Sequence, residues 1–234
     1  MQRLSAAQKP GRGAPPYSRW VNRPLGRVIA ATAYLVDLKP NHVTALSAAC
    51  TFTGIALLAL VPPVPWLGLV VGVLLVLGYA LDSADGQVAR LRGGGSLAGE
   101  WLDHMVDVTK TCLLHVAVLV SFARFGYPGG PGTLLLPLGY LTVSVVSFFG
   151  IMLADQLKRS RGGATTAGRS RGRLQTLVAT PTDYGILCLV FLLAGWRDGF
   201  VVAYAVMLIG HSAALLAAIA KWWRDLTRMD HNGG

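Results

Sequence analysis

Residues 82–107 read DSADGQVARLRGGGSLAGEWLDHMVD, and this acidic stretch lies between two long apolar runs. It holds four aspartates, Asp82, Asp85, Asp103 and Asp107, in a chain of 234 residues that has only 11 acidic residues. Carboxylates at the edge of apolar segments are costly unless they are paired or bind a metal ion. The stretch therefore indicates a function that needs these four side chains.

The spacing of the aspartates predicts one cluster. Asp82 and Asp85 are three residues apart, and Asp103 and Asp107 are four apart, so on helices each pair shares one face. Two such helices that meet face to face would bring all four carboxylates together. A site made of oxygen ligands suits Mg²⁺ or Mn²⁺ better than zinc, and no Cys or His stands at zinc-ligand spacing. Three carboxylates suffice for two metal ions, so the fourth can serve in proton transfer.

The composition indicates a polytopic membrane protein of the all-α class. Hydrophobic residues make up 53% of the chain, too much for a soluble domain of this size. Residues 1–16 are polar and rich in Gly, Pro and basic residues, and we expect a disordered tail without the apolar core of a signal peptide. Residues 17–39 carry Arg19, Arg23 and Arg27 every fourth position, which predicts an amphipathic helix in the membrane interface or, alternatively, a basic flank of the first span.

Six apolar spans follow, and the fifth is the weakest because it is short. We expect them at residues 45–61, 65–81, 101–122, 133–153, 182–195 and 200–220. Residues 40–225 then form the membrane domain and 226–234 a C-terminal tail. Lys and Arg gather before the first span, in the second and fourth connections and after the last span, whereas the odd-numbered connections hold only Arg124 and Arg197. This asymmetry predicts a cell-membrane protein with both termini and the acidic stretch in the cytoplasm.

The net charge of +10 does not indicate a nucleic-acid-binding protein. The basic residues flank apolar spans, where topology and anionic lipid headgroups explain them, and no recognition motif accompanies them. Cys50, Cys112 and Cys188 stand singly in apolar runs and are expected to be packing residues. Gly68 and Gly72 are expected to be helix-packing residues as well.

Small and basic residues around the aspartates suit a nucleotide. Gly86 and Ala89 leave room for the close approach of a ligand, and Arg90 offers a planar fork for a phosphate. The pattern Asp82-x-x-Asp85-Gly86-x-x-Ala89-Arg90, eight residues, Gly99-x-x-x-Asp103-x-x-x-Asp107 resembles the full motif of the CDP-alcohol phosphotransferases (CDP-alcohol phosphatidyltransferases). Pro40-Asn41-x-x-Thr44 is similar to the usual lead-in of that family.

The resemblance implies a six-helix membrane fold, usually a homodimer, whose site opens to the cytoplasmic interface. It implies that Asp82, Asp85 and Asp103 bind metal, and that Asp107 is the general base and also touches metal. It places Gly86, Ala89, Arg90 and Gly99 around the CDP moiety. The implied reaction joins a CDP-linked alcohol to a hydroxyl acceptor, at least one of them a lipid, and releases CMP.

Four further residues are candidate contacts of the acceptor, and each has a plainer alternative. His104 could instead hydrogen-bond a neighbouring carboxylate, and Lys110 could form a structural ion pair. Arg173 belongs to a basic connection that topology alone explains. Asp183, at the start of the fifth span, could cap that helix instead.

Three functions remain open. The leading one is transfer of a phosphatidyl group from CDP-diacylglycerol to a polar hydroxyl acceptor. The second passes a phospho-amino-alcohol from its CDP derivative to diacylglycerol, because residues 99–104 resemble the Gly-Glu-x-x-Asp-His run of choline and ethanolamine phosphotransferases. His104 also replaces a Pro that phosphatidylglycerophosphate synthases tend to show. The third, from another class, is a divalent-cation transporter. A transporter has no need of the small and basic motif residues Gly86, Ala89, Arg90 and Gly99.

Overall fold

The computed structural model describes residues 15–94, 96–161 and 180–232, and within them it contains helices and no strand. Arg173 therefore lies outside the described residues, as does most of the expected N-terminal tail. The elements in chain order are η1 (Ser18–Asn22), α2 (Arg23–Leu35), α3 (Pro40–Leu60), α4 (Pro65–Leu91), α5 (Leu97–Phe125), η2 (Gly130–Leu134), α6 (Leu135–Ser160), η3 (Thr180–Thr182), α8 (Tyr184–Val190), η4 (Phe191–Leu193) and α9 (Arg197–Asn232). The all-α prediction is confirmed.

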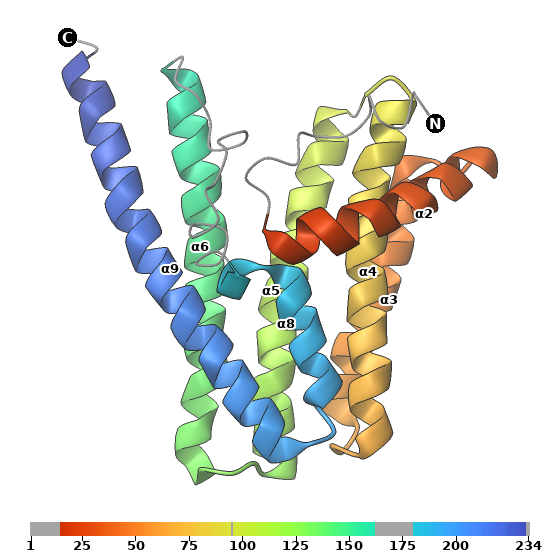
Figure 1. Ribbon diagram of the computed structural model, residues 1–234, viewed down its shortest axis with the longest axis vertical. Coiled ribbons are helices and arrows are strands. Elements are labelled where there is room, and N and C mark those ends of the chain that lie inside the picture. Colours follow the sequence, from red (N-terminus) through yellow and green to blue (C-terminus); the bar gives the residue numbers. More distant parts are fainter. Residues whose placement is uncertain (1–14, 95, 162–179, 233–234) are drawn as a thin grey trace.

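Among the described residues, five helices are long and apolar enough to cross a membrane, namely α3, α4, α5, α6 and α9. They run side by side along the long axis of the molecule (Figure 1). The expected fifth span, residues 182–195, is only a short apolar helix over Tyr184–Leu193. It begins at Asp183, whose side chain accepts a hydrogen bond from the Gly185 amide at 3.1 Å, and it tightens into the 3₁₀ turn η4. The chain is a polytopic membrane protein whose six apolar segments include one short helix.

Helix ends follow local signals, but several helices run past the expected spans, α4 and α9 by the most. Pro40 and Pro65 stand in the first turns of α3 and α4, where a missing amide hydrogen costs nothing. The Ser96 hydroxyl caps α5 by accepting from the Gly99 amide at 3.0 Å. Nothing breaks the helix after residue 81, so α4 carries the first two aspartates in its last turns. Similarly, α9 continues to Asn232, through most of the expected tail.

Small residues allow the helices of the core to approach closely. A Cβ atom at Gly78 of α4 would overlap the Thr51 side chain of α3. A Cβ atom at Gly68 would overlap the Leu192 carbonyl of η4, and one at Gly72 would overlap the Leu192 side chain. Gly68 and Gly72 are therefore packing residues, as expected. The pair holds the short fifth segment against α4.

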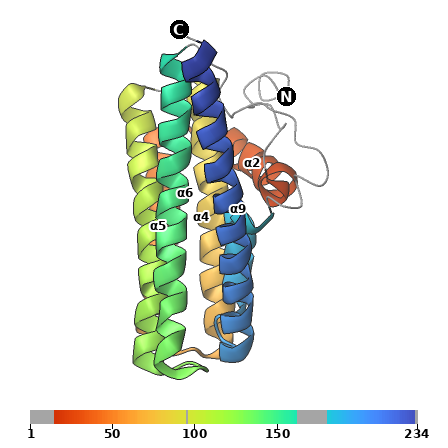
Figure 2. The ribbon, with the colours of Figure 1, turned by 90° about the vertical axis from the view of Figure 1, so that its left-hand side faces the viewer.

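Helix α2 runs across the bundle, not along it. It crosses α4 near the end that carries the aspartates (Figure 1), and a view turned by 90° shows it nearly end-on beside the bundle (Figure 2). Its buried residues are Gly26, Ala30 and Ala33, while Val28 is exposed, as is Trp20 of the preceding η1. Exposed apolar and basic residues on one crossing helix are typical of a helix at a membrane surface.

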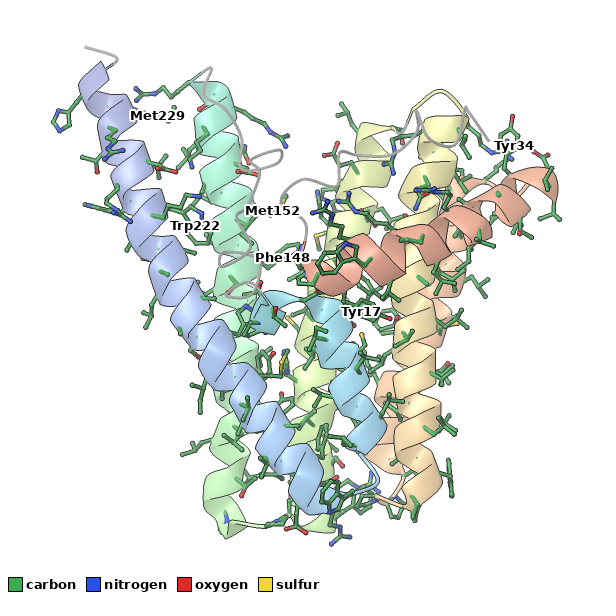
Figure 3. All side chains as sticks on the ribbon, viewed as in Figure 1. Tyr17, Tyr34, Phe148, Met152, Trp222 and Met229 are labelled. Carbon is green, nitrogen blue, oxygen red and sulfur yellow. The ribbon has the colours of Figure 1, made fainter. Side chains whose placement is uncertain are left out.

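The end of the molecule that carries the aspartates, at the top of Figure 1, holds α2, the C-terminal ends of α4, α6 and α9 and the start of α5. Between α6 and α9 at this end lies Trp222 (Figure 3), against which a Cβ atom at Gly150 would press at 2.5 Å. Lys158 of α6 and Asp225 of α9 form an ion pair of 2.7 Å there. These contacts tie the two long helices together at this end of the molecule.

Candidate active site

The four aspartates meet where α4 faces α5. Oxygen atoms of Asp82, Asp85 and Asp103 lie within 4.8 Å of one another, and so do ligand atoms of Asp103, His104 and Asp107. Asp103 belongs to both groups and so joins the two pairs. The structure thus brings the two carboxylate pairs together, as the spacing predicts, in two overlapping groups that share Asp103.

The donor set fits a divalent cation. Carboxylates packed this closely repel one another and are stabilised by positive charge. Their oxygens are the ligands that Mg²⁺ and Mn²⁺ prefer, and each ion accepts several of them. The His104 ring also packs edge-on against Phe148, with ring centroids 6.3 Å apart. The cluster can therefore bind a divalent metal ion through oxygen ligands.

Thr44 of α3 orients one of these carboxylates. Its hydroxyl donates to Oδ2 of Asp85 at 2.7 Å, and it also lies 3.2 Å from the Pro40 carbonyl. Asp85 itself is buried. The lead-in motif at residues 40–44 thus has a physical role, because it starts α3 and sets the direction of a predicted metal ligand. The sequence pattern contained Thr44 but gave no sign of its partner.

Lys110 lies beneath the carboxylates. Its Nζ atom is 2.5 Å from Oδ1 of Asp82, 3.5 Å from Oδ1 of Asp107 and 3.3 Å from the Ser47 hydroxyl. Only 5% of Lys110 is exposed. The structural ion pair, one of the two interpretations of this residue, is present in the structure. Lys110 offsets part of the negative charge that the aspartates bring to the site.

A pocket of about 240 Å³ opens beside the aspartates. Asp82, Asp85 and Asp103 line it together with Gly86 and Arg90. The Arg90 guanidinium folds back over Gly86, where a Cβ atom would lie 3.3 Å from its Nη1 atom. Carboxylates thus line one part of the pocket and a guanidinium another. Two further residues predicted to hold the nucleotide, Ala89 and Gly99, are not among the residues that line it.

Three residues of η1 and the start of α2, together called the N-terminal segment, also line this pocket, namely Ser18, Asn22 and Arg23. The sequence patterns did not single them out as site residues. They come from η1 and the start of α2, which lie 59 residues or more before the acidic stretch. Only the fold shows that this segment closes the pocket.

Asp183 holds the N-terminal segment. Its Oδ2 atom accepts hydrogen bonds from the amides of Tyr17 at 2.8 Å and Ser18 at 3.3 Å, while Oδ1 caps α8. Asp183 is 1% exposed and is not a lining residue of the pocket. Figure 3 shows Tyr17 beside the start of α8. The structure thus shows the capping alternative for Asp183, with an added contact to the start of η1.

Comparisons with known proteins bear on the family and the fold of the chain. Residues 38–222 match the family model described as CDP-alcohol phosphatidyltransferase. A crystal structure of Mycobacterium tuberculosis phosphatidylinositol phosphate synthase with CDP-DAG bound has a similar fold, with a TM-score of 0.55 at 20% sequence identity. The match covers 87% of this chain and 94% of that one. A comparison with curated protein sequences finds no significant match. The match over residues 38–222 shows that the chain belongs to the CDP-alcohol phosphatidyltransferase family and is a transferase of substituted phosphate groups.

Proposed function

We propose that this enzyme transfers a phosphatidyl group from CDP-diacylglycerol to a polar hydroxyl acceptor and releases CMP. The observation that carries the proposal is a single pocket lined by three motif aspartates, Gly86 and Arg90. Carboxylates bind cations, and a guanidinium binds phosphate directly. Both kinds of group suit the diphosphate of a CDP-linked donor. The similar fold of a synthase that holds CDP-DAG supports the lipid as donor.

Asp82, Asp85, Asp103 and Asp107 would hold two Mg²⁺ or Mn²⁺ ions. When bound, the ions neutralise the diphosphate and stabilise the charge that develops as it is cleaved. The chain contributes the geometry: Thr44 fixes Asp85 at 2.7 Å, and Lys110 fixes Asp82 at 2.5 Å. These contacts limit the rotation of both carboxylates before any ligand arrives.

The protein groups then divide the work of the transfer. Arg90 holds a phosphate oxygen, and Gly86 and Ala89 let the diphosphate lie close to α4. Asp107 removes the proton from the acceptor hydroxyl. The oxygen of that hydroxyl forms a bond to the phosphorus that carries diacylglycerol. The bond from that phosphorus to the CMP oxygen breaks, and CMP leaves. His104, Lys110, Arg173 and Asp183 stay candidate acceptor contacts.

The charge pattern supports a proposed orientation in the cell membrane. Lys and Arg gather in the even-numbered connections and beside the termini, which supports a cytoplasmic position for the active site and both termini. A homodimer is the assembly that the family resemblance implies. Cross-linking in membranes tests the dimer, and labelling of single cysteines from each side tests the orientation.

Purified protein in lipid nanodiscs tests the function. It is supplied with Mg²⁺ or Mn²⁺, with CDP-diacylglycerol or a CDP-amino-alcohol as donor, and with a phosphorylated polyol, a free polyol or an amino alcohol as acceptor. We expect CMP release only with CDP-diacylglycerol, and a new phospholipid that identifies the acceptor. Product from a CDP-amino-alcohol and diacylglycerol would establish the second function. No CMP from any pair would exclude both.

A further inference from the structure

The predicted nucleotide pocket has two walls of different origin. Asp82, Asp85 and Gly86 of α4 form one wall, and Asn22 and Arg23 of the N-terminal segment face it. Family motif residues supply the first wall. The second comes from outside the motif, so its residues have no role in the reaction as described above.

Contacts along η1 and α2 hold the second wall in place. Gly26 of α2 lies so close to α4 that a Cβ atom there would be 2.8 Å from the Ser83 hydroxyl. Just after α2, Arg92 donates to the Asp37 carboxylate at 2.7 Å and to the Leu38 carbonyl at 3.2 Å. Just before η1, the Asp183 carboxylate accepts a hydrogen bond from the Tyr17 amide. Asn22 is therefore placed at the pocket by contacts on both sides of it.

Asn22 has an unused hydrogen-bonding group. The residue is 3% exposed, and within residues 15–94, 96–161 and 180–232 no group bonds to its Oδ1 atom. It stands within a helical run, where Asn is unfavourable, and its side chain caps no helix end. A buried carbonyl oxygen without a partner lowers stability, and such groups are rare in folded proteins. Packing alone gives no reason for Asn at this position.

The chemistry of the unused atom selects its ligand. A carboxamide oxygen accepts hydrogen bonds, whereas phosphate oxygens are themselves acceptors, so the diphosphate cannot satisfy it. The nucleoside part of a CDP-linked donor offers the N–H groups of the cytosine amine and the O–H groups of ribose. We infer that Asn22 is a specificity residue that accepts a hydrogen bond from the nucleoside of the donor. This inference rests on the proposed function.

Binding of free CDP in the presence of Mg²⁺, measured by calorimetry on the nanodisc-embedded protein, tests the inference. Asn22→Leu keeps the branched shape and removes the polar atoms. We expect Kd for CDP to rise about tenfold, the value of one hydrogen bond. We also expect no fall in the unfolding temperature without nucleotide, because in the described part of the chain no group bonds to the Oδ1 atom that is lost. Asn22→Ala, which adds no bulk, should weaken CDP binding similarly.

A matched control removes a buried polar group that does have a partner. The Ser144 hydroxyl lies 3.0 Å from Nε2 of His115 inside the bundle. Ser144→Ala should lower the unfolding temperature and leave Kd for CDP unchanged, the reverse of the pattern for Asn22. Comparing CDP with UDP and 2′-deoxyCDP then identifies the donor group. The effect of Asn22→Leu disappears with UDP if the cytosine amine is the donor, disappears with 2′-deoxyCDP if the 2′-hydroxyl is the donor, and persists with both if the 3′-hydroxyl is the donor.

Two results would overturn the inference. Equal CDP affinity of Asn22→Leu, Asn22→Ala and the wild type would show that Asn22 does not contact the nucleoside. In that case the wild type still binds CDP, and the proposed function stands. A wild type that binds no CDP and releases no CMP would instead overturn the proposed function together with the inference.

Discussion

The hydroxyl of Thr44 donates to Oδ2 of Asp85 at 2.7 Å and so joins the start of α3 to the last turns of α4. The bond connects the lead-in motif at residues 40–44 with the acidic motif 41 positions later. A hydrogen bond to a predicted metal ligand fixes its orientation and tunes its affinity for the ion. The two motifs thus form one structural unit.

Removal of this bond should weaken metal binding. Thr44→Val keeps the β-branched shape and leaves Asp85 free to rotate. Loss of such an outer contact typically costs 10–100-fold in metal affinity, so we expect at least about a tenfold higher Mg²⁺ concentration for half-maximal CMP release. Thr142→Val is the control, because the Thr142 hydroxyl donates to the Leu138 carbonyl of its own helix. An unchanged Mg²⁺ requirement for Thr44→Val would show that Asp85 needs no such support.

Asp107→Asn should separate binding from turnover. The substitution keeps the shape of the side chain and removes its ability to accept a proton. General-base catalysis contributes roughly 10²–10⁴-fold, so we expect CMP release to fall by at least about 100-fold while Kd for CDP changes little. The control is Asp198→Asn, an exposed residue in the first turn of α9. Turnover close to that of the wild type in Asp107→Asn would remove Asp107 from the role of base.

Lys110→Met should make stability depend on metal. The substitution leaves the carboxylates of Asp82 and Asp107 without their buried counter-charge. Because both aspartates are part-exposed, we expect a loss of about 2 kcal/mol in the free energy of unfolding, below the cost for a fully buried pair. Mg²⁺ should restore most of it, since the ion replaces the lost positive charge. Thermal unfolding with and without Mg²⁺ measures both effects.

Lys158→Met is the matched control for this prediction. Lys158 is as buried as Lys110 and pairs with Asp225, away from the predicted metal ligands. Its loss should lower stability without recovery in Mg²⁺. The double variant Lys110→Met, Asp82→Asn should be less destabilised than Lys110→Met alone, because it removes both members of the pair. Equal recovery of Lys110→Met and Lys158→Met would contradict a specific role for Lys110.

Local patterns account for the helices and for the aspartate cluster. Long apolar runs predict the five spanning helices, and the spacing of three and four residues places each aspartate pair on one face. The fifth segment shows where such patterns fail. Its length depends on Asp183, which serves both the helix cap and the Tyr17 amide, and on the Leu192 backbone, which needs Gly68 beside it. These are contacts between distant parts of the chain.

The second wall of the pocket was not predictable for the same reason. The sequence around Asn22 and Arg23 indicates a basic amphipathic helix and nothing more. Their place in the pocket follows from the crossing of α2 over α4 at Gly26 and Ser83, which are 57 positions apart. Spacing arguments apply within one helix or between two helices known to be neighbours. No pattern within residues 17–39 identified α4 as the neighbour of this helix.

The last prediction concerns the contact between Tyr17 and Gly185, which holds the N-terminal segment in place. A Cβ atom at Gly185 would overlap the ring of Tyr17, so Gly185→Ala should displace the start of η1 from Asp183. We expect faster hydrogen exchange in residues 17–23 and a higher Kd for CDP, because Asn22 and Arg23 move away from the pocket. Gly139→Ala is the control, since its Cβ atom would lie 3.7 Å from Leu208, an ordinary contact. If Gly185→Ala speeds exchange in residues 17–23 but leaves CDP affinity unchanged, the N-terminal segment is no part of the nucleotide site.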